Sequence, residues 1–241
     1  MIIDEAHEHV VEEENYFVSM TDMMVGLIFI FLILLTFSAL QFREETDRLD
    51  GSGTREALLK SLDERLRRVG VDMRVDPETG VARLSEKVLF ESGQAQLKPE
   101  GRAQIAQLAR QLMGTLPCYV DQPAPTEGCP PARHLVETLL IEGHTDGDAL
   151  AGSGALRDNW DLSVARATNT YRELVAAEPR LAQLCMRKPA SERCEPVLSV
   201  SGYGAQRPVK LGDDPASKQE NRRIDLRFIM STTTAPTDAG G

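Results

Sequence analysis

The feature that most constrains this chain is a long apolar run near its N-terminus, because such a segment must be buried or inserted into a bilayer. Residues 23–40 contain no Asp, Glu, Lys or Arg. At about 1.5 Å per residue, a helix of this length covers most of a ~30 Å hydrocarbon core. A cleavable signal peptide needs a basic leader, a shorter apolar core and a small-residue cleavage site, whereas this leader is acidic and has no Lys or Arg. We expect residues 16–42 to form a single retained transmembrane helix after an acidic cytoplasmic tail, residues 1–15.

One carboxylate, Asp22, lies at the mouth of the apolar run. An ionisable residue inside a membrane segment is costly and usually serves a function. The alternative is that Thr21 and Asp22 simply begin the helix, where a carboxylate favours the N-terminal dipole. Because the apolar pattern already includes residues 15–19 (NYFVS), we favour a position inside the helix and a functional role.

The remaining chain, roughly residues 43–241, has no second long apolar run, and its length suits one globular domain with a linker. The net charge of −10 argues against a nucleic-acid partner, which would need a basic face. All four cysteines lie here: Cys118, Cys129, Cys185 and Cys194. Two local disulfides, Cys118–Cys129 and Cys185–Cys194, are the economical interpretation and require an oxidising compartment such as the periplasm. Four buried thiols are the alternative, and spacing alone does not fix the connectivity.

Flanking charges and cysteines disagree about orientation. Arg43 and Arg48 follow the apolar run, so the positive-inside rule places the C-terminal side in the cytoplasm. The cysteine pairs favour the periplasm for the same side. Two or three flanking charges are a weak signal, so we expect a cytoplasmic N-terminus and a periplasmic C-terminal domain.

Hydrophobic periodicity divides the C-terminal part into helices and strands. An amphipathic stripe predicts a charged helical linker over residues 43–70, which either lies on the following domain or forms a dimer segment. Alternation around a Pro-Glu-Thr-Gly turn predicts a hairpin over residues 71–84. Helices are predicted at 97–114 and 159–178, and strands at 134–146, 196–204 and 221–230. The order β-α-β-α-β-β predicts an α+β domain over residues 71–230, with two helices on one face of a mixed sheet, and a disordered tail over 231–241.

Five motifs along this domain resemble, in order, those of the OmpA-like peptidoglycan-binding domain. They are LFESGQAQLKPEG, IEGHTD, NWDLSVARA, SGYGAQRPV and NRRIDLRF. The resemblance implies binding of the peptide stem of peptidoglycan, notably its diaminopimelate, by an Asp and an Arg, which are Asp146 and Arg166 here. The site residues carried over or expected beside them are Thr145, Asn159, Leu162, Arg222 and Arg223.

The chemistry of this pair is independent of the resemblance. A zwitterionic amino-acid terminus presents an ammonium and a carboxylate, so its site needs one acid and one guanidinium, which can bind a carboxylate through two hydrogen bonds. Helical spacing places Arg166 on a face turned away from the core. The expected inward stripe is Val164, Ala167, Thr168, Tyr171 and Val175. A Gly/Ser/Ala-rich insertion lengthens the segment between Asp146 and Arg166 relative to the common family pattern.

Catalysis is not expected, because His144, Asp146 and Ser163 do not form the arrangement of a hydrolytic triad and no nucleophile-elbow pattern occurs. No metal or cofactor is expected either, since His7 and His9 lie in an acidic segment without further ligand spacing. The sequence therefore predicts a binding protein rather than an enzyme.

An anchor helix with an acid near its cytoplasmic end, joined to an OmpA-like domain, resembles the B subunits of ion-driven stators such as flagellar MotB. That resemblance implies that Asp22 carries the transported ion, a proton by expectation. It implies that two copies sit within a pentameric MotA-like ring in a bacterial inner membrane. The motif SMTDMMVGL and the acidic leader depart from the flagellar pattern. These departures argue against flagellar rotation. Overall, the chain resembles more the MotB-like subunits (ZorB) of Zorya anti-phage defence systems, whose ring subunit is ZorA. A flagellar-type stator subunit and a passive membrane-to-peptidoglycan tether are the alternatives.

Overall fold

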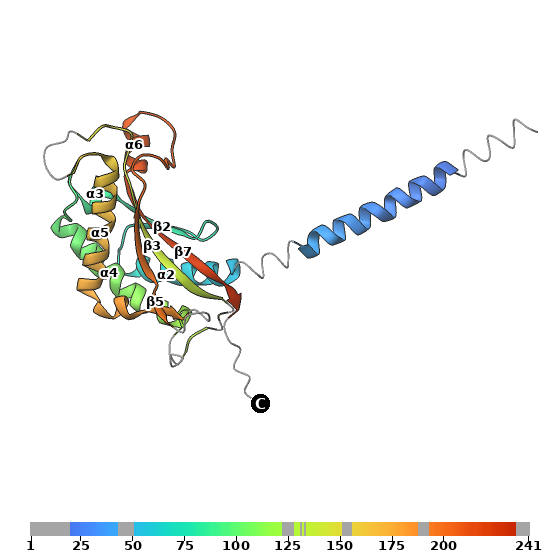
Figure 1. Cartoon of the computed structure of the whole chain (residues 1–241), viewed down its shortest axis with the longest axis horizontal. Helices are drawn as coiled ribbons and strands as arrows, with labels where there is room; N and C mark the ends of the chain where they lie inside the picture. Colours follow the sequence, from blue (N-terminus) through green and yellow to red (C-terminus); the bar gives the residue numbers. More distant parts are fainter. Residues whose placement is uncertain are drawn as a thin grey trace, which may run out of the picture. The chain divides into compact units, whose positions relative to one another are not determined.

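The computed structural model of the chain describes residues 20–42, 51–121, 128–130, 132, 134–150, 156–187 and 193–234. It separates into two compact units, Met1–Arg48 and Leu49–Gly241 (Figure 1). The predicted acidic tail, the first residues of the predicted membrane helix, the start of the predicted linker and the end of the predicted C-terminal tail lie outside the described residues.

The first unit contains one apolar helix, Met20–Phe42, of 23 residues. It is long and apolar enough to cross a membrane, and its large apolar side chains are exposed. Asp22 is also exposed and is the third residue of the described helix. The described part agrees with the expected single N-terminal apolar helix.

The second unit is built on a mixed sheet of five strands in the order β1-β2-β7-β3-β6. Neighbouring strands are antiparallel except for β3 and β6, which are parallel. The strands are β1 (Met73–Asp76), β2 (Val81–Ser85), β3 (His134–His144), β6 (Leu198–Gly202) and β7 (Arg223–Thr234). The α+β fold with a mixed sheet, predicted from the sequence, is confirmed. The strand β7 runs to Thr234, so the predicted tail from residue 231 begins too early.

Helices cover one face of this sheet, where the apolar side chains of the strands are buried. The main ones are α4 (Pro99–Met113) and α5 (Asn159–Ala177), with the short α3 (Glu86–Leu89) beside them (Figure 1). Alternation along β7 sends Ile224, Leu226 and Phe228 into this core, and sends Arg223, Asp225 and Arg227 to the opposite face. The opposite face of the sheet therefore carries charged side chains.

The helix α2 (Ser52–Arg68) corrects the predicted linker. Its Leu58, Leu59, Leu62 and Leu66 are at most 1% exposed and belong to the same hydrophobic core as α4. An amphipathic helix stabilises a domain chiefly by burying its apolar face. The predicted boundary at residue 71 is therefore wrong, because the compact unit begins at Leu49. Of the two alternatives for this helix, the structure places it on the domain.

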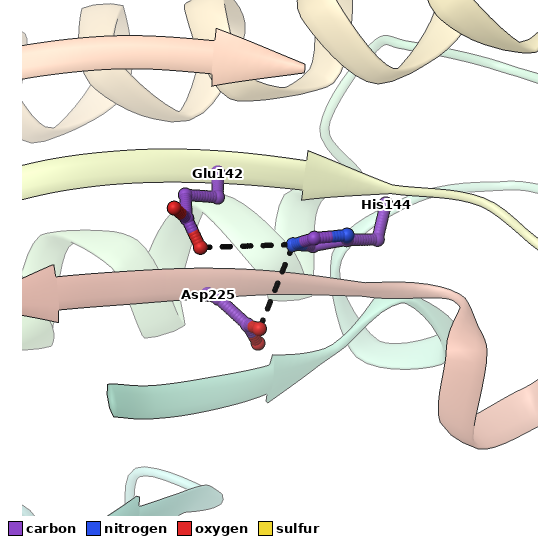
Figure 2. A group of neighbouring side chains, drawn as sticks. All are labelled: Glu142, His144 and Asp225. Carbon is purple, nitrogen blue, oxygen red and sulfur yellow. Dashed lines mark ion pairs between the residues drawn. The ribbon is translucent and has the colours of Figure 1, made fainter. Parts of the chain in front are cut away.

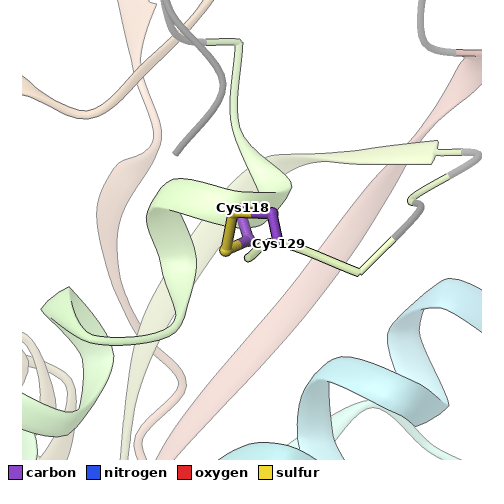
Figure 3. Close-up of a disulfide and its surroundings, with 2 residues drawn as sticks. All are labelled: Cys118 and Cys129. Carbon is purple, nitrogen blue, oxygen red and sulfur yellow. A yellow bond between two sulfur atoms is a disulfide. The ribbon is translucent and has the colours of Figure 1, made fainter. Parts of the chain in front are cut away.

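Both predicted disulfides are present. Cys118 lies on the 3-10 helix η1 (Leu116–Tyr119) and bonds Cys129, with the two Cα atoms 5.3 Å apart (Figure 3). Cys185 and Cys194 link β4 (Cys185–Arg187) to β5 (Cys194–Pro196), which form a separate antiparallel pair. The remaining short elements are η2 (Pro179–Gln183) and α6 (Pro215–Asn221).

Candidate functional site

Two glycines let α5 pack directly on the sheet and so position the site. A Cβ on Gly143 of β3 would overlap the carbonyl group of Ser163 in α5, and one on Gly202 of β6 would lie 2.5 Å from Val164 Cγ2. Only glycine allows so close a backbone approach. The end of β3, where the TD motif follows, is therefore held against the first turns of α5.

Asp146 lies just beyond β3 and is 8% exposed. The backbone N–H of the preceding Thr145 donates to the carbonyl of Gly204 at 2.9 Å, which extends the β3–β6 pairing into the loop. The Asp146 Oδ1 accepts a hydrogen bond from the Asp148 backbone at 3.2 Å. Asn159 Nδ2 donates to the carbonyls of Asp146 at 3.3 Å and Asp148 at 2.7 Å. Asn159 therefore holds the loop of Asp146, as its predicted place beside the site requires.

The cation beside Asp146 belongs to Arg222, which is partly exposed. Its Nη1 lies 2.5 Å from Asp146 Oδ2, and its side chain is 31% exposed. Arg222 closes the C-terminal end of α6 and precedes β7. An acid and a guanidinium thus stand together at one end of the sheet, which is the pair that a zwitterionic ligand needs.

Arg166 occupies a different place from the one predicted. It is only 2% exposed. Its Nη2 lies 2.7 Å from Glu86 Oε1, its Nε donates to the Gln94 carbonyl at 2.9 Å, and its guanidinium lies 5.2 Å from the Phe90 ring centroid. The prediction that Arg166 turns away from the core is wrong, because these partners satisfy a charge that would otherwise require solvent.

The predicted inward stripe of α5 is right only in part. Ala167 is buried, and Tyr171 and Val175 pack against the core. Val164, placed inward by periodicity, is 45% exposed. The buried residues are Leu162, Ser163, Arg166, Ala167, Thr170 and Leu174. The prediction assumed that Arg166 faces solvent, so it assigned the core-facing side of α5 to a partly wrong set of residues. The helix N-cap is Asp158, whose side chain accepts a hydrogen bond from the backbone N–H of Asp161.

Glu86 is a site residue that sequence reasoning missed. It is 4% exposed and touches both arginines, with Oε2 lying 3.7 Å from Arg222 Nε. Burial raises the pKa of its carboxyl group, and the charges of Arg166 and Arg222 only partly oppose that rise. Its chain separation of 80 residues from Arg166 explains why no local sequence pattern indicated the pair.

Two of the other predicted residues take largely structural positions. Leu162 is 3% exposed in the first turns of α5. Arg223 is 5% exposed and donates to Asp225 Oδ2 at 3.0 Å and to the carbonyls of Asn221 and Arg207 at 3.1 Å each. These hydrogen bonds use most of the donors of the Arg223 guanidinium group. In the structure, Arg223 therefore holds the loops around the site.

A buried charged cluster, formed by Glu142, His144 and Asp225, lies on the face of the sheet opposite α4 and α5 (Figure 2). His144 Nε2 lies 3.8 Å from Glu142 Oε2 and 3.6 Å from Asp225 Oδ2. Arg227 donates to both oxygens of Glu142 at 2.9 Å. Burial favours a higher pKa for Glu142, but its contacts with His144 and Arg227 outweigh burial and lower the pKa to about 2. Because guanidinium groups already neutralise both carboxylates, the cluster is described better as an ion-pair network than as a ligand set for a divalent cation.

Comparison with known proteins supports the fold. No family model matches the chain. The crystal structure of a MotB-like protein from Desulfovibrio vulgaris is 19% identical and covers 76% of this chain and 98% of its own, with a TM-score of 0.53. The domain has the OmpA-like fold of that MotB-like protein.

Two further relatives are more distant or only partly matched. The periplasmic domain of Helicobacter pylori MotB is 18% identical over 62% of this chain and 74% of its own, with a TM-score of 0.43. YtxE of Bacillus subtilis, which carries no described function, is 26% identical over 152 residues. The match covers 63% of this chain and 49% of YtxE, so the chain spans about half the length of that relative.

Proposed function

We propose that this chain is the peptidoglycan-anchored B subunit of an ion-driven stator-type motor in a bacterial inner membrane. The observation that carries the proposal is the combination, in one chain, of an apolar helix bearing Asp22 and an OmpA-like domain in which Asp146 pairs with the partly exposed Arg222. A passive tether would need the domain and the helix, but it would have no use for a carboxylate in its anchor.

The geometry around Asp146 supports the proposed wall-binding step. Without ligand, Arg222 neutralises Asp146. The ammonium group of a zwitterionic stem residue would replace Arg222 on Asp146, and the freed guanidinium would bind the adjacent carboxylate through charge-assisted hydrogen bonds. Arg166 stays a proposed ligand residue. It would contribute to ligand binding either through Glu86, with which it pairs, or after its guanidinium group is released from Glu86.

The ion-carrying step is assigned to Asp22. A carboxylate at a low-dielectric helix interface can alternate between charged and neutral forms, because burial raises its pKa and a polar neighbour or cation lowers it. Such an interface requires other subunits around the helix. We propose a dimer of this chain within a pentameric MotA-like or ZorA-like ring, with a proton as the ion, the N-terminus in the cytoplasm and the domain in the periplasm. The departures of the leader and the Asp22 motif from the flagellar pattern favour a Zorya-type role in anti-phage defence over flagellar rotation.

Wall binding is tested with the full-length chain in detergent and purified peptidoglycan sacculi. Asp146→Asn keeps the side-chain size but removes the charge, so the variant should no longer sediment with sacculi. Asp63→Asn is the matched control, because Asp63 forms a surface pair with Arg67 on α2 and should not affect binding. Wild-type sedimentation of Asp146→Asn, with an unchanged circular dichroism spectrum, would contradict the assigned site.

A further inference from the structure

An arginine-lined cavity of about 310 Å³ lies beside the candidate site. Four guanidinium groups contribute to its walls, those of Arg74, Arg83, Arg222 and Arg223. Arg74 and Arg83 are direct cross-strand partners on β1 and β2. Because Arg222 also contacts Asp146, one side chain borders both the cavity and the candidate site.

The register of the sheet gives the approximate distance between the cavity and Asp146. Ser85 of β2 lines the cavity and pairs with Arg223 of β7, which in turn pairs with His144 of β3. Asp146 follows His144 by two positions. Adjacent strands are about 4.8 Å apart, so the cavity wall lies on the order of 10 Å from the strand that leads into Asp146. About three residues of an extended peptide, or one residue with a long side chain together with its neighbour, span such a distance.

Positive charge exceeds negative charge in this cavity. Arg74 is exposed and forms no ion pair within the part of the chain that the structure describes. The Arg83 Nε is buried and forms an ion pair with Asp225 Oδ1 at 3.8 Å, but it has no hydrogen-bond partner. Of the two acids in the lining, Glu220 already pairs with Lys210 at 3.2 Å. In a chain with a net charge of −10, a lining of four arginines against two acids, Asp72 and Glu220, indicates a site for an anion.

We propose that this cavity binds a second carboxylate of the same peptide stem whose zwitterionic end binds Asp146. The inference rests on the proposed wall-binding function. A peptide stem contains an acidic residue next to its diamino acid, and the free carboxylate of that residue lies within the required reach. Arg74 and Arg83 would bind it as charge-assisted donors. The cavity would thereby select stems that carry a free carboxylate over stems in which it is amidated.

The test uses two synthetic stem peptides, L-alanyl-γ-D-glutamyl-diaminopimelate and the same peptide with the glutamate α-carboxylate amidated. Calorimetry measures their binding to the full-length chain in detergent. The wild type should bind the carboxylate peptide roughly tenfold more tightly than the amide, because a hydrogen bond to a charged group contributes about that factor. In Arg74→Gln/Arg83→Gln the ratio should fall to about one, with affinity for the amide unchanged. Arg67→Gln, a surface arginine on α2, is the matched control.

The outcomes separate this inference from the function on which it rests. If the wild type bound both peptides with equal affinity, the proposed carboxylate site in the cavity would be wrong. This comparison needs no variant. An unchanged tenfold ratio in Arg74→Gln/Arg83→Gln would place the discrimination elsewhere and overturn it as well. Failure of both peptides to bind the wild type, together with failure of the wild type to sediment with sacculi, would instead refute the proposed wall binding.

Discussion

Replacing Arg166 by Met tests whether its guanidinium group is buried and paired with Glu86, as in the structure, or exposed to solvent, as helical periodicity predicted. Met retains much of the aliphatic stem but removes the charge, and leaves Glu86 buried without its 2.7 Å partner. Removing one member of a buried ion pair costs about 3–5 kcal/mol. Arg222 still faces Glu86 at 3.7 Å, so we expect the lower end, about 3 kcal/mol. With a urea m-value of about 2 kcal/mol/M, the unfolding midpoint should fall by about 1.5 M.

The pH dependence of this cost has a definite sign. Burial already raises the pKa of Glu86 above its ordinary value, and loss of Arg166 removes the largest opposing charge and should raise the pKa further. The folded variant then binds a proton more readily than the unfolded chain. The penalty is therefore full above the raised pKa and shrinks as pH falls towards the ordinary value of a Glu.

The assay is urea unfolding of residues 49–241, the compact unit, at pH 8 and pH 5. The double variant Glu86→Leu/Arg166→Met removes both charges and should recover most of the lost stability, because apolar pairs often replace buried ion pairs without cost. A loss below about 0.5 kcal/mol in Arg166→Met, which is typical of surface substitutions, would show that Arg166 is solvent-exposed and would refute this account of the site.

Three further perturbations test the framework around the site. The 11-residue separation of Cys118 and Cys129 gives about 2.8 kcal/mol by the chain-entropy relation, so Cys118→Ser/Cys129→Ser should lose about that much stability. If all four cysteines of the wild type were labelled when it is isolated with free thiols blocked, the proposed periplasmic location would be contradicted. The pKa of Glu142 is lowered to about 2, so its stabilising effect is complete above the ordinary pKa of a Glu and is lost as pH falls towards 2. Glu142→Gln should therefore flatten the plot of urea midpoint against pH in this range, and an unchanged plot would argue against the ion-pair network. Gly143→Ala should cost about 1–3 kcal/mol by overpacking against α5, whereas Gly147→Ala, with open space around its Cβ, should match wild type. Equal urea midpoints for the two variants would rule out the close approach of β3 to α5.

The sequence predicted the fold well because its patterns are local. Alternation in residues 71–84 and helical periodicity in 97–114 each report on neighbouring residues, and the structure has β1, β2 and α4 there. The two disulfides were predictable for the same reason, since each joins cysteines close in sequence. The boundary of the domain was not, because burial of α2 depends on the docking of its leucines into a core assembled from distant elements.

The site was predicted only in part. Motif positions led to Asp146 and Arg222, which the structure brings into contact. The orientation of Arg166 depends on Glu86, which is distant in sequence and lies in no motif. Periodicity treats every guanidinium as solvent-facing, so it cannot predict one whose donors are satisfied inside the domain. The arginine cavity also needs the register of β1 and β2, which the sequence does not specify residue by residue.

The central claim, that this chain couples ion flow to a wall-anchored complex, is tested most directly by Asp22→Asn. This change keeps the side-chain size and removes the ionisable group. The variant is expressed with its neighbouring genes, and phage plating efficiency is measured beside a pull-down of the membrane complex and sacculus sedimentation. Thr36→Ser, a conservative change on the same helix that keeps a hydroxyl able to donate to the helix backbone, is the control. We expect Asp22→Asn to assemble and to bind sacculi normally while losing phage protection. Full protection by Asp22→Asn at normal expression would contradict the ion-carrier role and leave a passive tether as the better account.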